Sequence, residues 1–552
     1  MFNRRQFLRS ALAASLATWA LRPSAAEAMA ADPAEVMLNR LTFGATPDSR
    51  AALAALGRAA WLDDQLARPA QDADLDARLA DLRLRISYEA GDQGEDYRWS
   101  AMDEMRPLAA LTADPATLLP LIDWERPMHY AERARPADEV IAAALVRAVH
   151  APAQLREVMT QFWHDHFNVH AHKNEYVAIS FPAYDAMLRD HALGNFRAML
   201  GEVARAPAML YYLNNDESRA SPANENFARE LLELHTLGAG HYLNDRYNRW
   251  SDVPGAAAGL AEGYIDEDVY EVARAFTGWS VGDGRWLAEG SEAPRTLRFH
   301  YVDGWHDPYQ KRVLGREFSP NRAPLADGEE VLDLLATHPG TARFICTKIA
   351  RRLLADDPDP ALVDRLAEVF VAQATAPDQI AQVIRALVAD PAFAAPPGKL
   401  RRPFEYLAAL YRASGAKVVS PENSYHWQLS RAGWMQHTFP PPTGHADRSE
   451  DWQTSTVILR LVDLALSAHD DWFGATAVPI GSAVPAEVRR LGDLAGFWAT
   501  RLQGAPGDRL QEMFATLDIP ADQPLPTDAQ GRHDYSTVAI AMAALSPQFL
   551  FR

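Results

Sequence analysis

The chain has 552 residues, of which 48% are hydrophobic, and it carries a formal net charge of −19 at pH 7. A chain of this length can bury a large core. Its acidity argues against a nucleic acid or an anionic membrane as a partner, because phosphate groups would repel it. The single cysteine, Cys346, cannot form a disulfide within the chain.

The first 28 residues predict an export signal. Arg4 and Arg5 precede a Phe-Leu pair in the order of a twin-arginine motif, a modestly apolar run follows, and small residues suited to cleavage lie near Ala28. We therefore expect residues 1–28 to be removed and the remainder to be periplasmic or secreted through the twin-arginine pathway. No later segment is long and apolar enough to predict a stable membrane span.

The remainder, residues 29–552, predicts a single large domain of the all-α class, a multi-helix globular bundle. Apolar residues recur at spacings of three and four, and glycine and proline lie mainly between the periodic segments. The segments that we predict as helices are 33–68, 136–149, 152–170, 176–213, 224–238, 266–278, 326–391, 399–414, 453–467, 486–516 and 534–547. Within this domain, residues 87–135 predict an irregular insertion, and residues 417–552 form a C-terminal helical part.

The pattern changes between Trp279 and Phe318. Residues 296–301 and 311–314 are typical of short strands, and we expect a small β-hairpin excursion around residues 296–315. Residues 239–263 predict a loop.

The segment around His166 carries the first candidate for function. On a helix, His166 lies on the apolar stripe with Met159 and Phe162, whereas His164 points the opposite way. His166 is therefore the histidine expected to face the interior, and a helix that continued would place His170 beside it. A single histidine on an apolar face is more often a hydrogen-bonded core residue than a metal ligand.

Residues 224–238 predict a helix with ionisable groups on faces that should be covered. Phe227 and Leu231 mark its apolar stripe, Glu230 and Glu233 lie to one side of the stripe, and His235 lies on the other. A buried carboxylate is costly unless it is paired, protonated or bound to a cation. Two such carboxylates on one helical face therefore require an explanation.

A metal centre is one explanation. Imidazole and carboxylate are the usual ligands of zinc, iron and manganese, and helical bundles build such centres from facing side chains. The predicted ligands of one divalent metal are His166, Glu230, Glu233 and His235.

The alternative is a buried ion-pair network. Arg229 lies four residues before Glu233, and Arg274 could neutralise Glu230. We weigh the metal centre and the ion-pair network equally, because both perturb carboxylates.

A second group of polar residues follows the first predicted strand. His306, Asp307 and Lys311 could form an acid–base or substrate-orienting element at the mouth of the site. With Glu230 they are the predicted catalytic residues. The alternative is a turn-stabilising aspartate and an exposed lysine.

Several of these motifs, in this order, resemble one bacterial family, the domain of unknown function 1800. The motifs include Leu38–Thr46, Phe162–Phe167 (where the family typically has asparagine in place of Asp165), Asn224–Gly238, Thr277–Trp279 and Ser546–Phe549. The resemblance implies export and architecture, since the family's activity is unassigned. Its genes often lie beside another exported family, the domain of unknown function 1501, which resembles sulfatases and is thereby implied as a candidate partner.

Three functions remain as hypotheses. The first is a metal-dependent periplasmic enzyme, either a hydrolase or an oxidoreductase, with a His/Glu site. The second is a non-catalytic partner or maturation factor for a neighbouring exported enzyme. The third is a helical scaffold that binds glycan or peptide.

Overall fold

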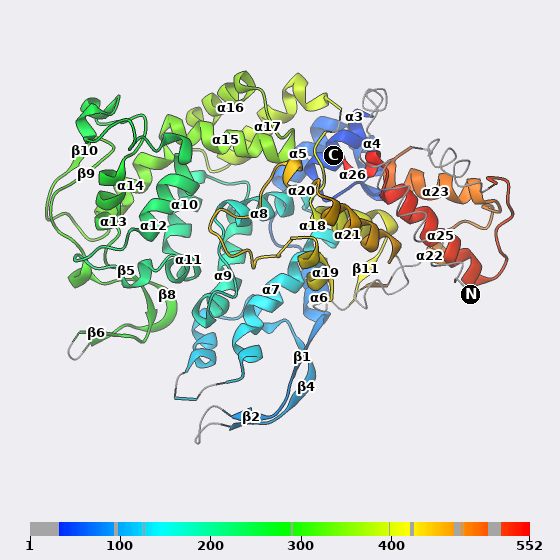
Figure 1. Ribbon diagram of the computed structural model, residues 1–552, viewed down its shortest axis with the longest axis horizontal. Helices are drawn as coiled ribbons and strands as arrows, with labels where there is room; N and C mark the ends of the chain where they lie inside the picture. Colours follow the sequence, from blue (N-terminus) through cyan, green and yellow to red (C-terminus); the bar gives the residue numbers. More distant parts are fainter. Residues whose placement is uncertain are drawn as a thin grey trace.

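The computed structural model describes residues 32–92, 98–123, 125–126, 128–288, 291–396, 398–419, 424–467, 476–477, 480–505 and 520–552. The predicted export signal and residues 506–516 of one predicted helix lie outside this part of the chain. In the described part, helices predominate and the strands pair in two-stranded antiparallel sheets (Figure 1). The predicted all-α class with a minor β component is confirmed.

The N-terminal part begins with short helices and continues into a β-hairpin. Its elements are α3 (Pro33–Leu41), α4 (Pro47–Leu56), α5 (Arg58–Ala67), α6 (Ala73–Asp81), β1 (Arg83–Tyr88), β2 (Gly91–Asp92), β3 (Arg98–Trp99), β4 (Met102–Pro107) and the 3-10 helices η1 (Ala109–Thr112) and η2 (Pro115–Ile122). The hairpin of β1 and β4 lies partly in residues 87–135, which the sequence predicts to be irregular. Successive side chains of β1 alternate between exposed and buried, so one face of this strand is covered. The side chains of β4 are mostly exposed, and β4 therefore shows no alternation of apolar and polar residues.

The middle of the chain contains the longest helices. They are α7 (Tyr130–His150), α8 (Gln154–His166), α9 (Glu175–His191), α10 (Phe196–Arg205), α11 (Pro207–Tyr212), η3 (Asn215–Glu217), α12 (Glu225–Glu230) and the π-helical turn η4 (Leu231–Thr236). Side-chain caps define several of their starts. Asn174 accepts a hydrogen bond from the backbone N–H of Val177, and Asn195 accepts one from Ala198, so each satisfies a donor that the helix leaves free.

A mixed region follows, with short 3-10 turns, strands and one helix. Its elements are η5 (Ala239–His241), η6 (Trp250–Asp252), η7 (Ala256–Ala258), α13 (Asp266–Ala275), β5 (Trp279–Asp283), β6 (Trp286–Ala288), β7 (Ser291–Glu292), β8 (Arg295–Tyr301), η8 (Asp303–Trp305), β9 (Lys311–Val313) and β10 (Arg316–Phe318). Strands occur at both predicted positions, but the predicted pairing between them is wrong. β8 pairs with β5 and β9 pairs with β10.

The remaining helices run to the C-terminal end of the chain. They are α14 (Ala326–Ala336), α15 (Pro339–Leu353), α16 (Pro360–Ala372), α17 (Gln379–Ala389), η9 (Pro391–Ala394), α18 (Pro403–Ser414), α19 (Ser424–Arg431), α20 (Ser449–Trp452), α21 (Ser455–Leu466), α22 (Ile480–Ala483), α23 (Leu491–Gln503), α25 (Ala529–Ala544) and α26 (Pro547–Leu550), with a small sheet of β11 (Lys417–Val418) and β12 (Thr476–Ala477). No described helix is both long enough and apolar enough to cross a bilayer.

Helices α7, α8, α9 and α18 form the centre of the molecule (Figure 1). Helix α7 packs against α8, α9 and α18, and α8 also packs against α9. Helix α8 is consequently buried on nearly all sides, including positions that its apolar periodicity assigns to solvent, such as Glu157 and His164. Polar residues on α8 must therefore find partners inside the protein.

A buried network of charges joins α18 to distant parts of the chain. Glu405 on α18 forms ion pairs with Arg352 of α15, with Arg402 and with Arg552. Arg402 also pairs with Asp165 at the end of α8, with 2.8 Å between Nη1 and Oδ2. All three guanidinium groups are almost fully buried, so Glu405 neutralises charge from three separate segments.

We expect Glu405→Gln to lower the free energy of unfolding by about 3–5 kcal/mol, because it removes the buried counter-charge that three guanidinium groups share. Denaturant titration followed by circular dichroism measures the change. As a control, Asp252→Asn removes the partner of Arg249 in a solvent-exposed ion pair and should leave the unfolding midpoint unchanged. A midpoint for Glu405→Gln equal to that of the control would contradict the structural role of this network.

Candidate functional site

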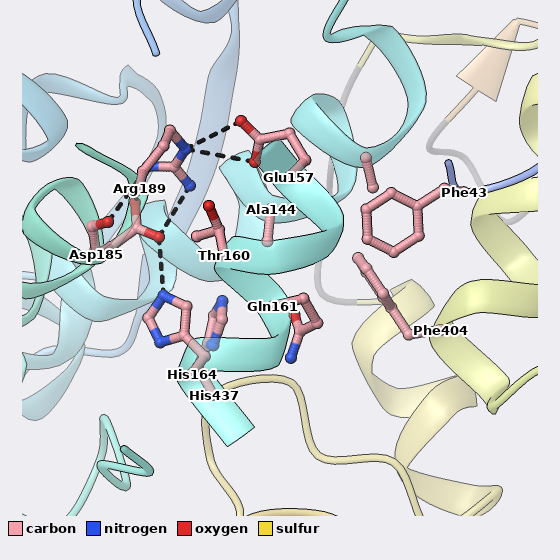
Figure 2. Close-up of a pocket in the computed structure, with 11 residues that line it drawn as sticks. Phe43, Ala144, Glu157, Thr160, Gln161, His164, Asp185, Arg189, Phe404 and His437 are labelled. Carbon is pink, nitrogen blue, oxygen red and sulfur yellow. Dashed lines mark hydrogen bonds and ion pairs between the residues drawn. The ribbon is translucent and has the colours of Figure 1, made fainter. Parts of the chain in front are cut away.

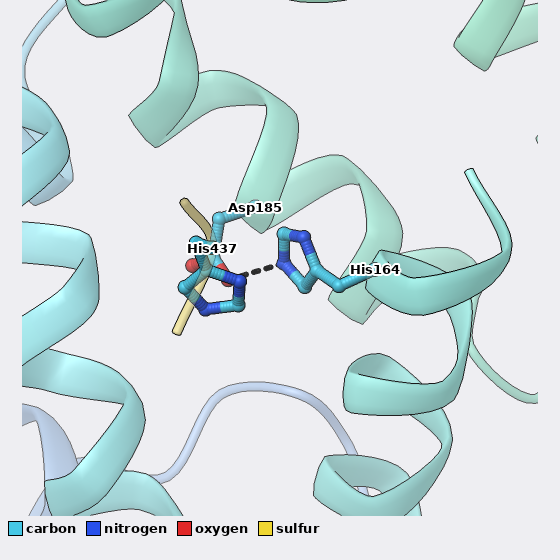
Figure 3. Close-up of side chains that lie close together, drawn as sticks. All are labelled: His164, Asp185 and His437. Atoms are coloured by element: carbon cyan, nitrogen blue, oxygen red, sulfur yellow. Dashed lines mark hydrogen bonds and ion pairs between the residues drawn. The ribbon is translucent and has the colours of Figure 1, made fainter. Parts of the chain in front are cut away.

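Three polar side chains converge where α8, α9 and a C-terminal segment meet. His164 lies near the end of α8, Asp185 lies on α9, and His437 lies between α19 and α20. All three side chains are buried (Figure 3). Each offers one possible ligand atom, and the three atoms lie within 4.8 Å of one another, an arrangement that no other His, Cys, Asp or Glu residues form in the described part of the chain. Elements far apart in sequence thus place two imidazoles and a carboxylate together.

The contacts within this group are close. The Nε2 atom of His164 lies 3.0 Å from Oδ1 of Asp185 (Figure 3). The rings of His164 and His437 have centroids 4.1 Å apart and are inclined by 47°. Ligands about 2 Å from a common ion lie about 3 Å from one another, so the separation of His164 and Asp185 suits a shared cation as well as a hydrogen bond.

Arginine side chains hold Asp185 in place. Arg189 lies one turn along α9 and donates to both carboxylate oxygens at 2.8 and 3.0 Å (Figure 2). Arg147 of α7 donates to Oδ2 at 3.1 Å. Arg189 also pairs with Glu157 of α8. Burial alone would raise the pKa of Asp185, but the two guanidinium groups outweigh it and hold that pKa well below its usual range, so the carboxylate is ionised.

His437 is held in an unusual backbone conformation. Its φ of 55° is in the left-handed region of backbone conformation, which residues other than glycine rarely adopt. The indole N–H of Trp434 donates to Oε1 of Gln436, which orients the amide so that its nitrogen donates to Gln161 and to Nε2 of His437. Burial, and then the neighbouring His164, hold the pKa of His437 well below its ordinary value. His437 is therefore neutral. Its Nε2 accepts from Gln436, so its hydrogen lies on Nδ1, and a metal bound at Nε2 would take the place of the amide hydrogen bond.

A cavity of about 20 Å³ adjoins the group, with room for about one water molecule. The residues that line it are Phe43, Ala144, Ala148, Glu157, Thr160, Gln161, His164, Asp185, Arg189, Phe404 and His437 (Figure 2). Apolar side chains from α7 and α18 close one side, and the polar group forms the other. An ion or one small molecule fits this space, whereas a polymer does not.

The predicted ligand His166 lies outside this group. Helix α8 ends at His166, so the predicted continuation to His170 is wrong. The His166 ring is buried, and its two nitrogens are engaged by the carbonyl oxygen of His235 at 3.1 Å and by Nζ of Lys348 at 2.9 Å. The prediction that His166 faces the interior is correct, but His164 on the opposite side is buried as well.

Residues 224–238 do not form the predicted continuous α-helix. After Glu230 the chain widens into the π-helical turn η4, which changes the angle between successive side chains and so displaces the predicted faces. Glu230 and Glu233 are half-buried, and His235 is fully buried. Burial and then the charge of Glu233 raise the pKa of Glu230 to about 6. These residues and His166 do not bring three ligand atoms within 4.8 Å of one another.

The predicted ion-pair partners of these glutamates are also wrong. Arg229 lies 3.6 Å from carboxylate oxygens of Glu225 and Asp266. Arg274 pairs with Glu271 and Asp307 at 2.8 Å rather than with Glu230. Both arginines therefore neutralise carboxylates on or near α13.

The structure brings His306, Asp307 and Lys311 together. Lys311 is fully buried and lies 2.7 Å from Asp327, which also lies 3.3 Å from His306. Asp307 accepts two hydrogen bonds from Arg274, which hold its pKa below the usual range even though burial acts to raise it. The expectation of an exposed lysine is wrong. The three residues form an ion-pair network with Asp327, in which each charge already has a partner.

Residues 278–282 have the Gly-x-Ser-x-Gly spacing of a hydrolase nucleophile. Ser280 lies within strand β5, is fully buried, and donates its hydroxyl hydrogen to the carbonyl oxygen of Asp216 at 2.6 Å. A hydroxyl that is enclosed in a strand cannot reach a substrate, so this motif is structural.

Sequence reasoning missed Asp185 and His437 and assigned His164 to solvent. One local signal was available, because Asp185 and Arg189 are four residues apart on a helix, in positions that interact. His437 follows no periodic segment, and only the tertiary structure brings it to α8. The helical wheel of α8 could not show that α3, α5, α7 and α9 pack around it.

Comparison with known families gives one match. The family described as protein of unknown function (DUF1800) matches residues 36–551. No curated protein and no solved structure matches the chain.

The buried, neutral imidazole of His235 should make the stability of the protein depend on pH. Burial, and then Lys348, lower its pKa to about 3. The unfolded chain binds a proton below about pH 6.5 that the folded chain does not, so stability falls as pH decreases from 6.5 toward 3. We expect His235→Phe to reduce this slope by about 1.4 kcal/mol per pH unit at pH 5. Denaturant titrations between pH 7 and 4.5 measure the slope, and an unchanged slope would contradict a neutral, buried His235.

Proposed function

The chain belongs to the DUF1800 family of proteins of unknown function, and we propose that it is an exported, metal-dependent enzyme whose centre is formed by His164, Asp185 and His437. One observation carries the proposal, namely the convergence of two imidazoles and an ionised carboxylate from three separate elements. The backbone of His437 in the left-handed region supports it, because such conformations concentrate at functional sites.

The two imidazoles and the carboxylate determine which metals suit the site. Two histidines and one carboxylate are typical of mononuclear iron(II) centres that leave coordination positions open, and the same ligands also suit zinc and manganese. The metal would supply Lewis-acid or redox chemistry at the adjoining cavity. Arg189 and Arg147 would act as the outer shell that orients Asp185.

The size of the cavity favours one reaction class over the other. With room for about one water molecule, it can admit a small molecule next to the metal but not a segment of polymer. An oxidoreductase that acts on a small molecule such as dioxygen is therefore preferred to a hydrolase of envelope polymers.

Export through the twin-arginine pathway is part of the proposal. Proteins that use this pathway cross the membrane folded, so a buried centre could be loaded with metal in the cytoplasm and carried to the periplasm. An exported protein of the domain of unknown function 1501 family is the proposed partner.

A second function is favoured by the arginine side chains. Arg189 and Arg147 already neutralise Asp185, so a divalent cation would add positive charge to a site whose ion pairs are balanced. On that basis the network would be purely structural, and the protein would be a non-catalytic partner or maturation factor for an exported enzyme.

Metal analysis of the exported protein, purified from its own host, separates the two functions. We expect one zinc, iron or manganese ion per chain. His437→Gln should remove the metal while the ion pairs of Asp185 remain, so the variant should stay folded. Glu230→Gln should retain the metal, because Glu230 is outside the proposed centre.

His191→Gln is the matched control, since His191 lies at the end of α9 and outside the group. It should retain the metal. Wild-type protein without metal, or His437→Gln with an undiminished metal content, would contradict the proposed centre. Loss of metal in Glu230→Gln would instead favour the turn η4 as the site.

A further inference from the structure

Lys348 lies on α15 and is directed toward the end of α8 and the turn η4. It is one of only five lysines in the chain, the others being Lys173, Lys311, Lys399 and Lys417. Its side chain is half-buried, with Nζ 2.9 Å from Nδ1 of His166. Helix α15 packs against η4, so the amine lies where three elements meet.

The partner of Lys348 differs from those of three other lysines, of which Lys311 and Lys399 are buried and Lys173 is exposed. Lys311 and Lys399 each form ion pairs with aspartates, at 2.7 and 2.9 Å. Lys173 donates to an amide and to a backbone carbonyl. In the described part of the chain, Lys348 has no carboxylate oxygen within the 4.0 Å of an ion pair, and its hydrogen-bond partner is an imidazole.

The hydrogen bonds of His166 fix which of its nitrogens faces the amine. Nε2 lies 3.1 Å from the carbonyl oxygen of His235. A carbonyl only accepts, so Nε2 carries the hydrogen and Nδ1 presents a lone pair to Lys348. With one hydrogen and one lone pair, this imidazole offers Lys348 a hydrogen-bond acceptor without a compensating negative charge.

His235 is the second unusual group beside the amine. It is 1% exposed, and neither of its ring nitrogens has a hydrogen-bond partner among the described residues. Its ring lies 6.3 Å from that of His166 and 5.1 Å from that of Phe167. Buried polar atoms normally have partners, and those that do not are often reserved for a ligand. The π-helical turn that carries His235 is a feature that also occurs frequently at functional sites.

We propose that Lys348 is the nucleophile of a second site, distinct from the metal centre, that condenses with the carbonyl group of an aldehyde or ketone. The uncharged Nζ attacks the carbonyl carbon, and one of its two protons passes to the oxygen to give a carbinolamine. The hydroxyl group then leaves with the remaining proton on nitrogen as one water molecule, and a C=N bond forms. The unpartnered nitrogens of His235 supply hydrogen-bonding capacity for a polar group of the bound compound.

The electrostatic surroundings favour an uncharged amine. Burial is the largest cause that lowers the pKa of Lys348, and the positive charge of Arg351 lowers it further. The negative charges of Asp165 and Asp447 act to raise this pKa, and the result is a value of about 8. Those two aspartates are themselves engaged by Arg402 and Lys399. At pH 7 roughly one Lys348 in ten is then uncharged, compared with fewer than one in a thousand for an ordinary lysine.

Reductive alkylation tests this site with the folded, exported chain. The probe is propionaldehyde with cyanoborohydride, which donates hydride to the imine and leaves a propylated amine that peptide mass mapping locates. We expect Lys348 to react with an apparent pKa near 8, whereas exposed Lys417 should react with one near 10. The apparent pKa does not depend on how easily the probe reaches each lysine.

A matched pair of variants separates the local charge from simple access. His166→Asp places a carboxylate beside Nζ and should raise the apparent pKa of Lys348 by at least one unit. His166→Asn, of similar size but neutral, should leave it near 8. An apparent pKa near 10 in the wild type, or no modification of Lys348 while Lys417 reacts, would overturn the proposal.

Discussion

The fold depends on one constraint, which is that a charge brought into its interior must find an opposite charge or a hydrogen-bond acceptor there. Helix α8 shows this most clearly, because α3, α5, α7 and α9 pack against it and bury most of its polar side chains. Glu157 and His164 face Arg189 and Asp185 on α9, and Asp165 faces Arg402 on α18. Packing of apolar side chains supplies most of the stability, but these ion pairs fix the helices in one arrangement. The candidate centre is part of that arrangement and not an addition to it.

Two imidazoles on α8 consequently have different surroundings. His164 faces α9 and joins Asp185 and His437, whereas His166 faces η4 and α15 and contacts Lys348. One short segment thus contributes to two candidate sites on opposite sides of the same helix. The first is rich in paired charge, and the second is apolar, with neutral imidazoles around a lysine. This difference suits a cation in the first and an uncharged carbonyl compound in the second.

The sequence was sufficient to predict the helical class, most helix positions and the interior location of His166, because these follow from local periodicity. It was insufficient wherever a second element decides the outcome. The wheel of α8 assigned His164 to solvent, since nothing local indicates that α9 covers that face. The helical-wheel projection of residues 224–238 places each side chain 100° after the previous one. This angle does not hold in the π-helical turn η4, so the predicted faces of the helix are wrong there. Partners distant in sequence, such as Asp307 for Arg274 and His437 for His164, could not be inferred from spacing at all.

The central claim is that His164, Asp185 and His437 together hold a divalent metal. Anomalous diffraction from crystals of the protein purified from its own host, collected above and below the absorption edges of iron, zinc and manganese, tests it most directly. The account predicts one anomalous peak at about 2 Å from a ring nitrogen of each histidine and from a carboxylate oxygen of Asp185. A map with the three side chains well ordered and no peak between them, or with the peak beside Glu230 and Glu233, would contradict it.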